Sequence, residues 1–92
     1  MDRFIKLTVS NIDSYINVSD IISIASIKTS STEQVQISYS SLRNYRANIT
    51  AGAGTNIYQF IIDNILKANN SSKTETVFTP ENQPTLVALS FI

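Results

Sequence analysis

Both glycines of the chain stand in residues 48–60, NITAGAGTNIYQF, between an expected strand and an expected helix. Such a loop can bind phosphate, because backbone N–H groups at a helix N-terminus point toward an anion. A nucleotide loop also needs a lysine and a hydroxyl at fixed spacing, or a third glycine in the dinucleotide pattern. This loop has no lysine, and Ile57 takes the place of the third glycine. We interpret Gly52-Ala53-Gly54 as a bend, and the sequence leaves open whether its amides bind an anion.

A second candidate site is the segment LRNYRAN at 42–48, which places a tyrosine between two arginines. Arg43, Tyr45 and Arg46 could hold single-stranded nucleic acid through charge and base stacking. However, seven basic and seven acidic residues give a formal net charge of +0, so the usual electrostatic footprint of nucleic-acid binding is missing. Tyr45 also shares strand parity with Ile49, which is typical of a core residue. Nucleic-acid binding by a small barrel is therefore the alternative function.

The residue types that carry catalysis and metal binding are scarce. The chain has no histidine and no cysteine, which removes the commonest metal ligand and all thiolate chemistry. Asp63 is the only acid on the expected helix, so no acid pair at helical spacing frames a metal there. Ser72 and Lys73 adjoin in a polar turn, which does not by itself make a catalytic dyad. We expect no enzyme, no cofactor and no metal.

Composition points to one small, soluble, strand-rich domain over residues 1–92. Charged residues make up 15% of the chain, against about 25% in ordinary proteins. No apolar run approaches the roughly 20 residues of a membrane span. Arg3 and Lys6 interrupt the N-terminal segment, so it lacks the apolar core of a signal peptide. We expect a protein of the cytoplasm or of a virion, with no membrane contact.

Alternating apolar and polar residues predict several strands. The pattern covers 3–10, 33–39 and 45–51, with one inward face listed here: Ile5, Leu7 and Val9; Val35, Ile37 and Tyr39; Tyr45, Ala47, Ile49 and Ala51. A turn at 11–13 is expected to join the first strand to a second as a hairpin. The segment 19–28 is irregular, and we interpret it as a strand with a bulge near Ala25-Ser26. A short helix over 19–24 is the alternative.

Helical spacing of apolar residues follows the glycine loop. Thr55 is expected to cap a helix over about 56–69, a contribution of about 1 kcal/mol. Its apolar face is expected to comprise Ile57, Tyr58, Ile61, Ile62, Ile65 and Leu66. The whole pattern predicts an α+β, β-rich fold: six or seven mostly antiparallel strands in a strongly bent sheet or small barrel, with one helix at about 55–69.

The N-terminal pattern consists of IKLT at 5–8, Asn11 in a turn, IN at 16–17 and DIISI at 20–24. It is similar to that of the small FlbD-type flagellar proteins, and the similarity covers residues 4–69. Ile12 stands where that family has glycine, and the loop 52–54 and the segment 70–92 have no counterpart there. The chain equally resembles short uncharacterised proteins of phage and marine genomes. The resemblance implies a small β-rich protein that binds a protein partner and carries no catalytic motif.

Two features predict self-association. Phe60 falls among polar positions of the expected helix, beside Asn64 and Lys67. The strand expected at 85–92 is apolar on both faces, with Leu86, Ala88 and Ile92 on one and Val87, Leu89 and Phe91 on the other. Such a strand is central in a sheet or is covered by another subunit. We expect a non-catalytic homo-oligomer, a phage-type or flagellar-type accessory protein, with an interface that includes Phe60, Leu86, Val87, Leu89 and Phe91.

Overall fold

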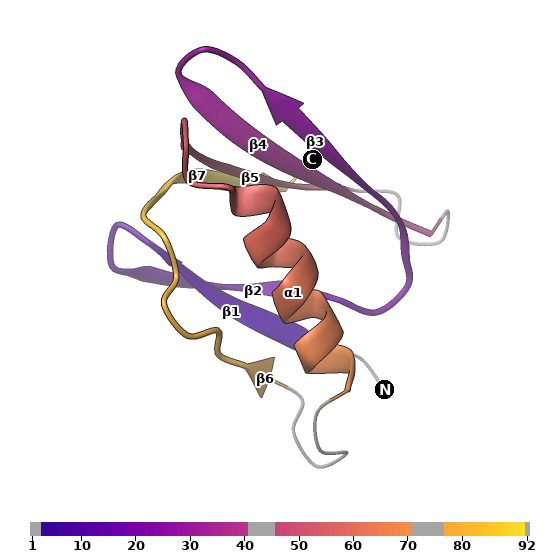
Figure 1. The fold of residues 1–92 in the computed structure, drawn as a ribbon. Coiled ribbons are helices and arrows are strands. Elements are labelled where there is room, and N and C mark those ends of the chain that lie inside the picture. The colour runs from indigo at the N-terminus through magenta and orange to yellow at the C-terminus, as the bar shows by residue number, and fades with distance from the viewer. Residues whose placement is uncertain (1–2, 41–45, 71–76, 92) are drawn as a thin grey trace.

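A computed structural model describes residues 3–40, 46–70 and 77–91. Within these residues the elements are, in order, β1 (Phe4–Val9), β2 (Ile12–Asn17), β3 (Ile21–Lys28), β4 (Thr32–Tyr39), β5 (Arg46–Gly52), α1 (Ile57–Asn69), β6 (Val77–Phe78) and β7 (Leu86–Phe91). The strands form two sheets, β2-β1-β6 and β3-β4-β5-β7. Helix α1 runs across both sheets and contacts β4 and β1 (Figure 1). The predicted β-rich, mostly antiparallel α+β fold is confirmed, and its sheets are not closed into a barrel.

The first hairpin turns one residue earlier than predicted. Ser10 and Asn11 form the turn with φ values of 51° and 65°, and Val9 pairs with Ile12 across it. Two left-handed residues match the twist of the flanking strands, and asparagine tolerates that conformation well. Ile5 in this hairpin is buried, as the alternation predicts.

Strand β3 is a strand throughout its length, so the alternative helix over 19–24 is wrong. Its bulge lies between Ile21 and Ser23, not near Ala25-Ser26. A bulge adds one residue without a pairing partner and so reverses the alternation that follows it. As a result Ile21 and Ile24 both pack against the core, and Ile22 between them is exposed.

Strand β7 lies at an edge of its sheet, so of the two predicted alternatives, a central strand or a strand covered by another subunit, the first is wrong. Its pairing with β5 shifts at Val87, and the opposed residues are Ala51 and Leu86, Ile49 and Leu89, and Ala47 and Phe91. We call the face of this sheet that carries Ala47, Ile49 and Ala51 the inner face. The bulge places Leu86, Leu89 and Phe91 together on it, because opposed residues share a face. The prediction of two apolar faces assumed an unbroken alternation, and its sixth residue, Ile92, lies outside the described residues.

The core lies between the two sheets and beneath the helix. Its buried apolar residues are Ile5, Leu7, Ile16, Val18, Val35, Ile37, Tyr39, Ala47, Ile49, Ala51, Ile57, Ile61, Ile65, Ala68 and Leu86. The predicted inward residues of β4 and β5 are all among them, except Tyr45, which lies outside the described residues. The Tyr39 hydroxyl donates a hydrogen bond to the carbonyl of Asn17 and so links the two sheets.

The buried face of α1 is rotated from the predicted one. Its buried residues are Ile57, Ile61, Asn64, Ile65 and Ala68, whereas Leu66 is exposed. Helix α1 packs on β4 and β1, which belong to different sheets. In this orientation Phe60 is half-buried against the core. Asn64 is buried but satisfied, since its side-chain amide donates to the Phe60 carbonyl at 2.8 Å.

Candidate functional site

The glycine loop is occupied by a carboxylate of the chain itself. Glu33 on β4 is 7% exposed, and its two oxygens accept hydrogen bonds from the N–H groups of Gly54 at 2.7 Å and Ile57 at 3.2 Å. The predicted cap by Thr55 is wrong, because its hydroxyl donates to the Gly52 carbonyl at 2.8 Å. Asn56 takes the cap position in a left-handed conformation, without a side-chain cap. Gly54, at φ 84°, is the position in this loop that needs glycine.

The environment of Glu33 favours its charged form. The hydrogen bond from Gly54 lowers its pKa most, with further lowering by Ile57 and by the Lys28 charge, while burial acts in the opposite direction. The Glu33 carboxylate thus occupies the position where the amides of the loop could bind an anion. The loop therefore acts as a bend that is capped from within the chain. Inward parity with Val35 is the sequence signal that could have placed Glu33 there.

The other end of α1 is held by a positive charge. The Arg3 guanidinium donates a hydrogen bond to the Ala68 carbonyl at 2.6 Å. Glu33 at the N-terminus and Arg3 at the C-terminus both complement the helix macrodipole. Since Arg3 immediately precedes β1 and Glu33 lies in β4, each sheet holds one end of the helix. These charged residues therefore have a structural role.

The residues of the nucleic-acid alternative are only partly described. Arg43 and Tyr45 lie outside the described residues. Arg46 begins β5, is exposed, and pairs with Ser38 on the face opposite the inner face. The structure thus describes one of the three residues of this alternative.

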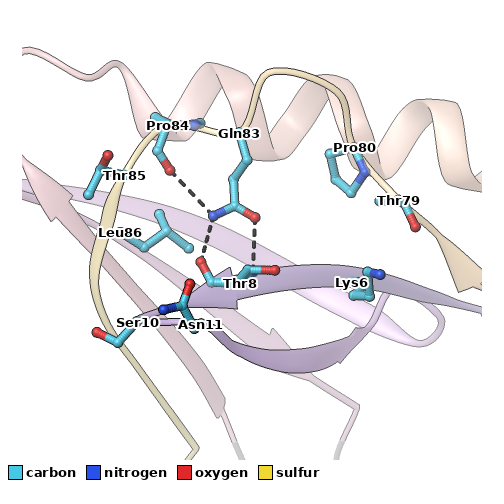
Figure 2. Close-up of a pocket in the computed structure, with 10 residues that line it drawn as sticks. All are labelled: Lys6, Thr8, Ser10, Asn11, Thr79, Pro80, Gln83, Pro84, Thr85 and Leu86. Carbon is cyan, nitrogen blue, oxygen red and sulfur yellow. Dashed lines mark hydrogen bonds between the residues drawn. The ribbon is translucent and has the colours of Figure 1, made fainter.

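A groove of about 400 Å³ lies between the first hairpin and the segment 79–86 (Figure 2). Across it, the Gln83 side chain accepts a hydrogen bond from the Thr8 N–H at 2.9 Å and donates one to the Thr8 carbonyl at 2.7 Å. This carboxamide supplies the donor and acceptor that a neighbouring strand would supply. Pro80 has no N–H to continue the β6 ladder, and Gln83 restores the pairing beyond it. We interpret the groove as a structural junction.

Residues 3–40, 46–70 and 77–91 contain neither a metal-ligand cluster nor a membrane-spanning helix. No group of three or more acidic residues, histidines or cysteines comes together there to hold a metal ion. Within the same residues, α1 does not have the length and apolar character needed to cross a membrane.

Among the residues that the structure describes, the exposed large apolar ones gather on edge strands. They are Ile12 and Tyr15 on β2, Ile22 and Ile27 on β3, Val77 on β6, Val87 and Phe91 on β7, and Leu66 on α1. Each of these four strands ends a sheet. We call the seven residues on these strands, without Leu66, the edge residues.

The predicted interface residues fall into three groups by burial. Val87 and Phe91 are 61% and 48% exposed, whereas Leu86 is buried in the core. Leu89 and Phe60 are partly buried and pack against the core. Phe60 is therefore not the exposed helix residue that its polar neighbours in sequence predicted, because the helix is rotated.

No family model matches the chain, and searches of the curated proteins and of the solved structures found no similar protein.

Proposed function

We propose that this protein is non-catalytic and acts by self-association and protein binding through the edges of its sheets. The observation that carries the proposal is the position of the edge residues. A strand at a sheet edge has a row of N–H and C=O groups available to a further strand. Where the same strand also exposes large apolar side chains, an added strand pairs the backbone and covers apolar surface at once. Strand addition is therefore the mode of binding.

The size of the molecule supports the same conclusion. A chain of 92 residues buries a smaller share of its surface than a larger domain does. Its small core already includes residues from both sheets and the helix. Burial of the edge residues against a second chain adds stability that the core alone does not supply. An accessory protein of the phage or flagellar type, in the cytoplasm or in a virion, fits this mode of action.

Light scattering coupled to size exclusion tests the proposal. Over a range of protein concentrations, we expect a mass that is a multiple of the chain mass of 10.2 kDa. Oligonucleotide binding is measured in parallel at two salt concentrations. A 10.2 kDa species at every concentration would contradict self-association. If that monomer also bound oligonucleotides strongly, with affinity falling as salt rises, the nucleic-acid alternative would replace the proposal.

A further inference from the structure

We infer that self-association is homotypic at β7: this strand pairs antiparallel with the β7 of a second copy about a twofold axis. The inference rests on the proposed function, which specifies neither the edge strand nor the partner, and it names both. Such pairing joins two four-stranded sheets into one continuous sheet.

The other edges carry features that discourage strand addition. Strand β6 has only two residues. Strand β2 contains Asp13, whose carboxylate accepts a hydrogen bond from the Thr8 hydroxyl at 2.8 Å on the exposed surface. Strand β3 has Asp20 just before it, Lys28 at its end and a bulge at Ile22. Charges and bulges are the means by which natural sheets protect an edge.

Strand β7 lacks the charged protection. Its six residues, LVALSF, contain no charge and no proline. Its bulge lies near one end and leaves Ala88 to Phe91 in regular pairing with β5. This stretch is therefore the best available template for a further strand.

The core is left open at the β7 edge. Along the inner face of this strand, Leu86 is buried, Leu89 is partly buried and Phe91 is 48% exposed. The inner face of β3 is apolar only over its first half, where Ile21 and Ile24 pack against the core; Ser26 and Lys28 follow opposite Val35 and Glu33. A second β7 places another set of leucine and phenylalanine side chains beside Leu89 and Phe91. The apolar layer thus continues across the junction.

A twofold axis perpendicular to the sheet gives antiparallel strands and keeps the two inner faces on the same side. The contact is closed, because each copy uses the same strand and has none left for a third at that edge. Pairing of β7 with the β3 of another copy would instead repeat head to tail and produce an open chain. The inference therefore predicts an assembly whose mass never exceeds that of two chains, at any concentration.

Single cysteines report the edge directly, because the chain has none of its own. Ala88 and Ser90 are exposed and lie on the outer face of β7, opposite Thr50 and Asn48. A disulfide needs Cα atoms within about 7 Å, so only residues near the axis can form one. Ala88→Cys, Ser90→Cys and their equimolar mixture cover three neighbouring registers. The matched control is Ser23→Cys, an exposed residue on the outer face of β3.

After mild oxidation, non-reducing gels should show a covalent dimer for at least one of the three β7 samples. Ser23→Cys should remain a single chain. In a second arm, Ser90→Lys places a positive charge from each copy at the junction and gives β7 the kind of charge that protects a sheet edge. It should convert the dimer to a monomer in light scattering, with an unchanged circular dichroism spectrum, whereas Ser23→Lys should leave the dimer intact.

The outcomes separate the inference from the proposed function. If the wild-type protein is a monomer, both fail. If it associates but cross-links only through Ser23→Cys, or remains associated in Ser90→Lys, self-association stands and the β7 junction is wrong. A mass that rises with concentration beyond twice the chain mass of 10.2 kDa indicates the open chain and also overturns the twofold dimer.

Discussion

The Glu33 side chain determines which group the amides of the glycine loop bind. It lies at the start of a strand, and its carboxylate accepts hydrogen bonds from two N–H groups at the glycine loop and helix start. Its inward parity can be read from the alternation of β4. The distance to Gly54 cannot, because it depends on how β4 and β5 pair and on where the chain turns after Gly52. A prediction from sequence thus finds the residue type but not its partner.

Replacing Glu33 with glutamine should lower Tm at neutral pH. The amide offers one acceptor oxygen where the carboxylate offers two, and its NH₂ group faces backbone donors. Because the folded pKa of Glu33 lies below its ordinary value of 4.5, its stabilisation is present above that pH and is lost as pH falls through the folded pKa. The Tm difference between wild type and Glu33→Gln, measured by thermal denaturation, should therefore be constant near neutrality and vanish in acid.

Glu81→Gln is the matched control, since Glu81 is exposed in the segment before β7. It should change Tm little. If its profile equals that of Glu33→Gln, the effect is one of overall charge and not of the helix cap.

Phe60→Ser should reduce stability and leave the oligomer mass unchanged. Phe60 is half-buried against the core, so the loss should be about 1–3 kcal/mol, less than for a fully buried phenylalanine. Leu66→Ser, on the exposed side of the same helix, should cost less than about 0.5 kcal/mol. Urea denaturation measures both. If Phe60→Ser kept the stability of the wild type but lowered the oligomer mass, Phe60 would belong to the interface.

At the scale of elements, periodicity predicts which segments are strands but not where their alternation breaks. The bulges of β3 and β7 arise from pairing with β4 and β5, and nothing in the local sequence marks Ile22 or Val87. The same limit applies to α1, whose apolar residues cover a broad arc. Contacts with β4 and β1 select the part of that arc that is buried.

The Gln83 junction gives a prediction at this scale. Gln83→Glu keeps the shape of the side chain but replaces the donor that bonds the Thr8 carbonyl with an acceptor. The lost hydrogen bond and the new repulsion should lower the unfolding free energy by about 1–3 kcal/mol. Gln34→Glu, on the outer face of β4, is the control and should have little effect. Equal losses in the two variants, measured by urea denaturation, would mean that the junction contributes nothing of its own.

The whole molecule has a radius of gyration of 12.6 Å, close to the roughly 12 Å expected for a compact chain of this length. Compactness and exposed edges coexist because two short sheets end in four edge strands. Composition predicts a small core, and the apolar C-terminal segment predicts an interface region. Which of its residues are exposed depends on a bulge and on edge position, which only the fold determines.

Self-association makes stability depend on concentration. If the folded chains bind each other, Tm should rise with protein concentration, because mass action favours the associated folded state. Calorimetry over a hundredfold concentration range measures this. Ser90→Lys should remove the dependence and Ser23→Lys should not. A wild-type Tm that is the same at all concentrations would argue against coupling between folding and association.

The hydrogen bonds at both ends of α1 restrict how the two sheets move relative to each other. The sheet that contains β4 holds one end of the helix through Glu33, and the chain just before β1 holds the other through Arg3. Because each hydrogen bond ties the helix to a different sheet, a change in the angle between the sheets strains them. The amide protons of Gly54 and Ile57 should therefore exchange with solvent deuterium only when the whole structure opens, at rates close to those of the core strands and unlike those of an ordinary surface loop.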